Sequence, residues 1–169
     1  MSAGTLISIE EYLNTSFRPD CDYVDGRILE RNVGKRRHGY AQGRISAWFI
    51  QLGETLGLDA LTALRIQVAP TRVRIADVVV VETPLPDEEV FTSPPFLCAE
   101  VMSPGDTAGS MQDLIGDYLN FGVPNIWVID PWKHRGWRVT REGWIPALDG
   151  IMRTADHRIA MPLSEVLLP

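Results

Sequence analysis

The chain has 169 residues, 45% of them hydrophobic and 22% charged, which is typical of a globular protein and excludes a disordered one. The net charge of −6 argues against a protein that coats nucleic acid, because such proteins usually carry a basic face. The longest apolar run, Val78–Val81, has the length of a strand and excludes a conventional membrane-spanning helix. We predict one domain over residues 1–169.

The first half of the chain predicts two helices and a hairpin. A capping-box pattern predicts a short helix over residues 7–15. The pair Asp25-Gly26 lies between two alternating runs and indicates a β-hairpin over residues 21–30. Apolar residues at helical spacing predict a long helix over residues 37–56, which Gly57 ends.

The second half of the chain is rich in predicted strands. Strands are predicted over residues 64–68, 72–81, 96–102 and 125–130, with short hairpin-like runs near 137–139 and 144–145. A helix is predicted from residue 106 or 107 to about 121, and a last helical turn over 164–168. This order predicts an α/β (α+β) fold with a central mixed sheet flanked by helices and with extra hairpins.

The first four residues, Met1–Gly4, are neither basic nor part of a long apolar run, so no secretory signal is expected. The two cysteines, Cys21 and Cys98, lie far apart in unlike contexts, and Cys98 is typical of a buried thiol. Both features predict a cytoplasmic protein.

The charges are unevenly distributed along the chain. No Lys or Arg occurs between Arg74 and Lys133, whereas ten acids lie there. The basic residues that would bind nucleic acid cluster earlier: Lys35, Arg36, Arg37 and Arg44. An acidic centre beside a basic helix start could hold a metal and steer a phosphate to it. A solvated charged surface would give the same pattern.

Two acids interrupt apolar strands. Asp77 lies within the strand predicted over residues 72–81, and Glu100 lies between Ala99 and Val101 in the following strand. A buried carboxylate is costly unless it is paired, hydrogen-bonded or bound to a cation. Two carboxylates on consecutive strands could hold one Mg²⁺, which keeps several waters and takes one or two protein carboxylates. The alternative is that each acid lies at a strand end in solvent.

Several motifs, in this order and spacing, resemble the Uma2 (Uma-two) family of restriction endonuclease-like proteins, a branch of the PD-(D/E)XK nuclease superfamily. They are Tyr23-Val24-Asp25-Gly26, His38, Ile75-Ala76-Asp77-Val78-Val79, Glu100-Val101-Met102-Ser103-Pro104, Tyr118 with Gly122-Val123, and Trp127-Val128-Ile129-Asp130-Pro131. The resemblance covers roughly residues 5–168. It implies a restriction endonuclease-like fold and hydrolysis of DNA phosphodiester bonds.

The resemblance also implies a metal site. Asp77 and Glu100 match the family's acids, although Ala76 stands where the family has proline. By resemblance they bind Mg²⁺ or Mn²⁺, with the backbone carbonyl of Val101 as a further ligand. The family match also implies a catalytic role for His38.

One departure from the family pattern affects catalysis. The lysine two residues after the glutamate would fall at Met102, and the alternative lysine of the following helix would fall at Leu114. Three explanations remain open. A cation from the cluster at residues 35–37 reaches the site, with His38. A neutral side chain, Gln67 or Gln112, orients the attacking water. Or the protein keeps the fold without efficient cleavage.

Two functions follow from these alternatives. The first is a metal-dependent endonuclease acting on DNA, and the second is a catalytically impaired domain that binds nucleic acid or assembles with protein. A homodimer is expected for the first, because duplex cleavage needs two sites and the aromatic-rich C-terminal strands could pair.

Overall fold

The structure is a computed structural model that describes residues 6–32 and 34–169. The segment Met1–Gly4, in which no secretory signal is expected, lies outside the described residues. Eight strands form one mixed sheet in the order β2-β1-β4-β5-β6-β7-β8, with β3 also paired to β4. Strands β5 and β6 are parallel, and the other pairs in this sheet are antiparallel. The predicted mixed α/β fold is confirmed.

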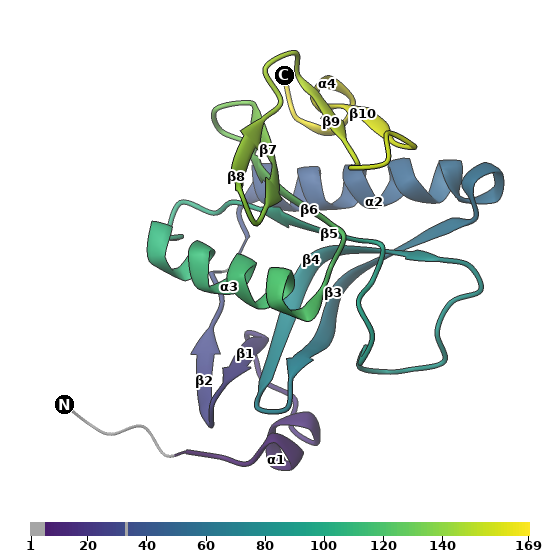
Figure 1. Cartoon of the computed structure of the whole chain (residues 1–169). Helices are drawn as coiled ribbons and strands as arrows, with labels where there is room; N and C mark the ends of the chain where they lie inside the picture. Colours follow the sequence, from purple (N-terminus) through teal and green to yellow (C-terminus); the bar gives the residue numbers. More distant parts are fainter. Residues whose placement is uncertain (1–5, 33) are drawn as a thin grey trace.

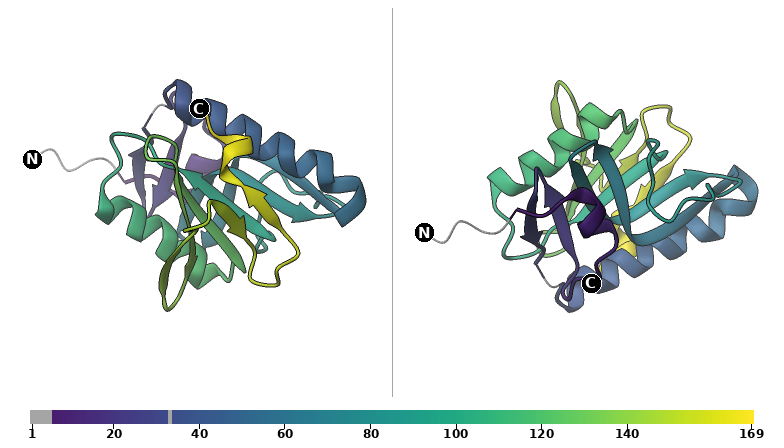
Figure 2. Two further views of the ribbon diagram at one scale, coloured as in Figure 1. Left: turned by 90° about the horizontal axis from the view of Figure 1, so that it is seen from above. Right: turned by 90° about the horizontal axis from the view of Figure 1, so that it is seen from below.

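The N-terminal elements form a small unit at one end of the sheet (Figures 1 and 2). They are α1 (Ile9–Leu13), β1 (Cys21–Val24) and β2 (Arg27–Glu30). The Ser8 hydroxyl accepts from the Glu11 N–H and caps α1. Asp25 and Gly26 have positive φ angles of 51° and 88°, as a two-residue hairpin turn requires. Strand β1 then pairs with the N-terminal half of β4.

The central elements build the two faces of the sheet. They are α2 (Arg36–Leu56), β3 (Leu58–Ala69), β4 (Arg72–Glu82), β5 (Leu97–Val101), α3 (Ala108–Phe121) and β6 (Asn125–Asp130). Gly57 and Gly122 end the two helices in the left-handed conformation. Helices α2 and α3 cover opposite faces of the sheet (Figures 1 and 2).

The C-terminal elements extend the sheet and add a second small layer. They are β7 (Arg135–Thr140), β8 (Gly143–Pro146), β9 (Ile151–Arg153), β10 (Ala160–Pro162) and α4 (Leu163–Val166). Strands β9 and β10 form a separate two-stranded sheet. Helix α4 packs on α2, so this layer covers the α2 side of the protein (Figure 1).

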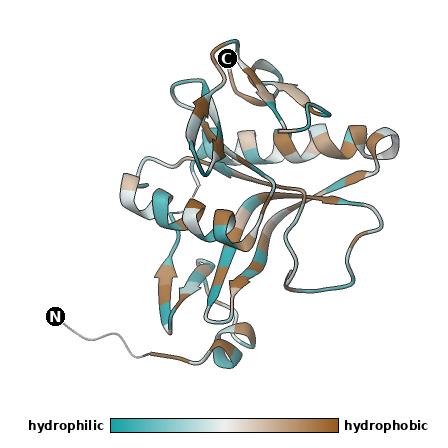
Figure 3. Cartoon of the chain, viewed as in Figure 1, coloured by the Kyte–Doolittle hydropathy of each residue, from teal (hydrophilic) through white to brown (hydrophobic). Residues whose placement is uncertain are grey.

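Each face of the sheet has its own hydrophobic core. Figure 3 shows that the central strands are largely hydrophobic, whereas α2 and α3 alternate between hydrophilic and hydrophobic residues. Val78 and Val80 of β4 pack with the α2 core, while Ala76 and Val79 pack with the α3 core. Ala76 and Val78 are two residues apart and should share a face of a regular strand. The alternation therefore breaks at Asp77, which lies between them.

Most predicted elements are confirmed, and three differ. Strand β3 begins at Leu58, six residues before the predicted start at Leu64. The short strands β9 and β10 were not predicted. Among the described residues, no helix has both the length and the apolar character that a membrane span requires.

Candidate active site

Asp77 lies at the break in β4, where its carboxylate is surrounded by donors. Its Oδ1 accepts from Arg31 Nη2 at 2.8 Å. Its Oδ2 lies 3.1 Å from Nε2 of His38 and accepts from the Val101 N–H at 2.8 Å. Burial alone would raise the pKa of Asp77, but the hydrogen bond from His38 and the charge of Arg31 hold it below its usual range. Asp77 is therefore ionised at neutral pH.

Glu100 lies on β5 and is almost fully buried on the α3 side. Its Oε1 accepts from the Tyr118 hydroxyl at 2.7 Å, and its Oε2 lies 3.6 Å from Arg31 Nη2. Burial, followed by the negative charge of Asp77, raises the pKa of Glu100 well above its usual range. The two acids are thus in unlike states: Asp77 is stabilised as an anion, and Glu100 favours its proton.

A cavity of about 130 Å³ joins the two acids to the surrounding elements. Asp77, Glu100, His38, Arg31 and Leu114 all line it, as do Asp22, Arg74 and Val101. Arg31 and Asn32, which follow β2, line this cavity together with Ser103 and Asp106 of the β5–α3 loop. Asn32 donates to Asp106 Oδ1 at 2.6 Å and so connects the end of the hairpin to the β5–α3 loop.

The geometry of the acid pair is compatible with one shared cation. The distances from Arg31 Nη2 to Asp77 Oδ1 and Glu100 Oε2 add to 6.4 Å, which is an upper limit for the separation of these two oxygens. Acids more than roughly 7 Å apart could not share one ion with ligands at ~2.1 Å. In residues 6–32 and 34–169, no three His, Cys, Asp or Glu side chains form a metal-binding group. The two carboxylates alone are a donor set that fits Mg²⁺, because this ion takes few protein ligands and keeps several waters.

The structure brings together most of the residues predicted for the site. His38 contacts Asp77, and Val101 lines the cavity and donates its N–H to Asp77. Leu114 lines the cavity from α3, so the position that lacks a lysine does face the acids. Gln67 is not brought to this site: it lies opposite Val73 in the β3–β4 pair and is not among the residues that line the cavity. A different glutamine, Gln42 of α2, donates to the backbone carbonyl of Asp77 at 2.8 Å.

The four predicted nucleic-acid-binding residues lie outside the cavity. Lys35 and Arg36 are exposed at the start of α2, beside His38. Arg37 contacts the carbonyl of Pro131 in the β6–β7 turn, and Arg44 donates to the carbonyl of Glu165 near the C-terminus. None of the four has a contact with Asp77 or Glu100 in the described part of the chain.

Arg31, which lies against both acids, was not predicted for the site. It follows β2 directly and lies 46 residues before Asp77, so no local periodicity connects the two. The available signal was indirect. An acid pair in a stretch without Lys or Arg needs a cation from elsewhere in the chain, and Arg31 ends the hairpin that precedes α2.

The fold and the site together define a nuclease-like α/β protein with a buried acid pair. A family model matches residues 9–148, and the chain belongs to this family, Uma2, described as "Putative restriction endonuclease". Among solved structures, the chain is similar to a "putative nuclease belonging to DUF820" from Anabaena variabilis ATCC 29413. The TM-score is 0.81 at 16% identity, over 95% of this chain and 97% of that chain, which shows a shared fold. No match was found among curated proteins.

Proposed function

We propose that this protein is a divalent-cation-dependent endonuclease that hydrolyses phosphodiester bonds of DNA. The observation that carries the proposal is the meeting of Asp77 and Glu100 beside His38 in one cavity. Membership of the Uma2 family supports the nuclease class.

Asp77 and Glu100 would hold the cation, Mg²⁺ or Mn²⁺, with the carbonyl of Val101 as a further ligand. When bound, such an ion polarises a phosphate and lowers the pKa of the attacking water. The protein prepares the ligands for this role. His38, Arg31 and the Val101 N–H hold the Asp77 carboxylate ionised and oriented, and Tyr118 fixes one oxygen of Glu100. The second oxygen of Glu100 remains directed toward the cavity side where Arg31 lies.

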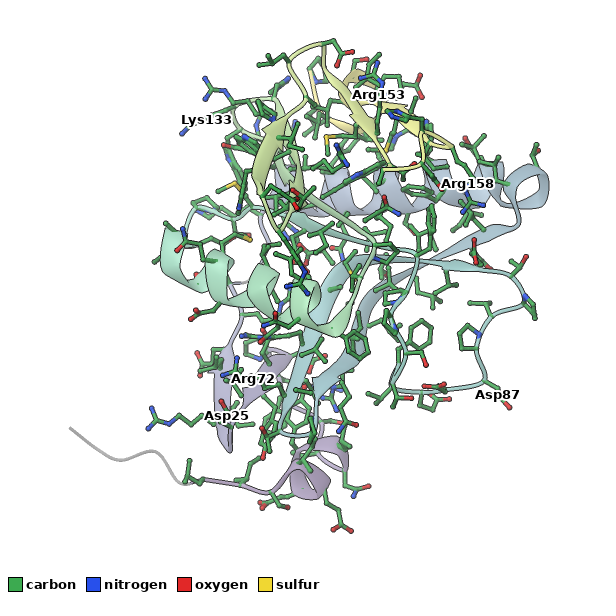
Figure 4. The ribbon with its side chains drawn as sticks, viewed as in Figure 1. Asp25, Arg72, Asp87, Lys133, Arg153 and Arg158 are labelled. Carbon is green, nitrogen blue, oxygen red and sulfur yellow. The ribbon has the colours of Figure 1, made fainter. Side chains whose placement is uncertain are left out.

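The DNA backbone would lie along the start of α2. Lys35 and Arg36 are exposed there, and the β6–β7 turn adjoins them through the contact of Arg37 with Pro131. Lys133 projects from this turn away from the sheet (Figure 4). These cations would supply the positive charge for the DNA backbone on a chain whose net charge is −6.

Cleavage of supercoiled plasmid tests the proposal. With Mg²⁺ or Mn²⁺, we expect the native protein to nick or linearise plasmid, and Asp77→Asn to reduce the rate at least about 100-fold. Even residues that only support metal ligands typically contribute 10–100-fold, and Asp77 is proposed as a ligand itself. Conversion of supercoiled to nicked and linear DNA on gels measures the rate.

Asp113→Asn is the matched control for this substitution. It removes the same charge from an exposed position of α3 beside Leu114 and should cleave like the native protein. Cleavage that persists in Asp77→Asn would refute the site. A native protein that binds DNA but never cuts it would favour the alternative function, a binding domain that keeps the nuclease fold.

Salt dependence tests the DNA-binding surface. Replacing both Lys35 and Arg36 by alanine should reduce the slope of log K against log salt for a DNA duplex by about 0.9 for each lost phosphate contact. Fluorescence anisotropy in Ca²⁺ provides the measurement. Arg27→Ala, an exposed arginine at the far end of β2 from Arg31, is the control and should leave the slope unchanged.

A further inference from the structure

Arg31 enters the cavity from the end of β2 and contacts both acids of the site. Its Nη2 lies 2.8 Å from Asp77 Oδ1 and 3.6 Å from Glu100 Oε2, and its Nη1 lies 3.7 Å from Asp22 Oδ1. Only the first of these distances is a hydrogen bond. The guanidinium therefore lies among three carboxylates but forms a hydrogen bond with only one of them, Asp77.

The bonding of Arg31 is also incomplete. Its Nη1 is buried and has no hydrogen-bond partner among the described residues. A buried donor without a partner costs free energy, and such groups are rare in native proteins, so this one requires an explanation. The side chain as a whole is 22% exposed and lines the cavity, although Nη1 itself is buried.

Two other nitrogen-bearing side chains of the cavity are each held by carboxylates. Arg74 uses Nε for Asp117 and Nη1 for Asp22, and both carboxylates are buried. His38 uses Nε2 for Asp77, and its Nδ1 side lies close to Gly34, where an added Cβ would come within 2.6 Å of that nitrogen. Among the described residues that line the cavity, Arg31 is the arginine that lies against both Asp77 and Glu100.

We propose that Arg31 binds the phosphate at which the chain is cut, supplying from the β2 end the positive charge that α3 lacks at Leu114. This inference rests on the endonuclease activity proposed above. A guanidinium suits the task because its fixed fork of donors matches the oxygens of a phosphate. The tether between Asn32 and Asp106 holds the adjacent backbone against the β5–α3 loop and so limits how far Arg31 can swing.

The test compares Arg31→Met with the native protein in three measurements. Plasmid cleavage should fall about 10²–10³-fold, the usual effect of removing one preorganised donor from the developing charge. Affinity for thymidine 5′-monophosphate in Ca²⁺, measured by calorimetry, should fall at least about tenfold, as expected for one charge-assisted hydrogen bond. Affinity for Mn²⁺ without nucleotide should be retained or increased, because a competing cation leaves the acid pair.

A second substitution tests whether cleavage depends on a positive charge in the cavity. Leu114→Lys in the Arg31→Met background places a cation in the same cavity from α3 and should restore at least tenfold of the lost cleavage. Arg65→Met is the matched control. Arg65 is similarly exposed at 19% and is ion-paired to Asp20 away from the cavity, so its loss should leave all three measurements unchanged.

The outcomes separate the two proposals. If the native protein cleaves and Arg31→Met cleaves equally well, the role of Arg31 is refuted while the endonuclease stands. Loss of Mn²⁺ binding in Arg31→Met would also refute it, because Arg31 would then only position the acids. If the native protein does not cleave, the endonuclease fails, and the role of Arg31 in phosphate binding is decided by the nucleotide affinity alone.

Discussion

Replacing Arg74 by methionine is expected to lower the free energy of unfolding by about 3–5 kcal/mol, the usual cost of breaking a buried ion pair by removing one partner. Arg74 is a side chain of β4 that is only 5% exposed. Its Nε donates to Asp117 Oδ2 at 2.6 Å and its Nη1 to Asp22 Oδ2 at 3.0 Å. Methionine fills the space but leaves both buried carboxylates without this cation. Urea denaturation measures the loss.

Arg72→Met is the control, because Arg72 binds the same Asp117 from two residues away. Its side chain is 32% exposed, and its second partner is Asp25 at the hairpin turn, toward which it points in Figure 4. Solvent screens such pairs, so the expected loss is within about 1 kcal/mol. Equal losses in the two variants would contradict the argument that burial makes the difference.

The same network links stability to the site. Asp22 accepts from Arg74 with Oδ2 and from the Ile75 N–H with Oδ1, and that Oδ1 also lies 3.7 Å from Arg31. The hairpin therefore positions Arg31 through a carboxylate that β4 already holds. This explains how a residue so close to a hairpin end can be presented to acids in the middle of the sheet.

The helices and the hairpin were predictable because their signals are local. The Asp25-Gly26 turn, Gly57 and Gly122 each require a positive φ, and glycine or a turn residue marks such positions in the sequence. The acid pair was predictable for a related reason. Asp77 and Glu100 interrupt apolar strands, and a buried acid stands out against apolar neighbours.

The missed elements depend on contacts that are distant in sequence. The first half of β3, Leu58–Ala63, contains residues of weak strand propensity and is a strand because it pairs with the buried valines of β4. Strands β9 and β10 have three residues each and are defined by pairing with one another. Tertiary pairing, which no local pattern encodes, decides these segments.

The missed cation has the same origin. The sequence directed attention to the cluster at residues 35–37, where the basic charge is densest, but α2 points these side chains to the exterior or to the β6–β7 turn. Arg31 reaches the acids because β2 ends beside the cavity and Asn32 is fastened to Asp106. The position of the chain at the end of β2, and not the local density of basic residues, therefore decides that Arg31 is the cation beside the acids.

Glu100→Gln is expected to stabilise the protein in EDTA while abolishing cleavage. Burial and the charge of Asp77 raise the pKa of Glu100, so the folded state favours a proton that the unfolded state releases above about pH 4. The free energy of unfolding of the native protein therefore falls as the pH rises from about 4 toward the raised pKa of Glu100. Glutamine is neutral in both the folded and the unfolded state, so it avoids this loss, and it keeps an oxygen to accept from the Tyr118 hydroxyl.

The predicted stabilisation by Glu100→Gln depends on pH. The difference in unfolding free energy between Glu100→Gln and the native protein should be near zero at pH 4 and should favour the variant at pH 8. Because the pKa of Glu100 is raised well above its usual range, the gain should grow as the pH rises above about 4. Glu89→Gln, an exposed loop acid, is the control and should show no such trend. A variant that is less stable at pH 8 would contradict the argument.

Added Mg²⁺ should reverse the order of the two proteins. A ligand that binds only the folded state stabilises it by about 2.7 kcal/mol at a concentration of 100 times Kd. The native protein should gain this stability, and Glu100→Gln should not, because one of the two proposed ligands is neutral. A free energy of unfolding that rises with Mg²⁺ in the native protein alone would tie the electrostatic cost of Glu100 to its function. Glu100 would then lower the stability of the metal-free protein and raise the stability of the protein with Mg²⁺ bound, as expected for a metal ligand.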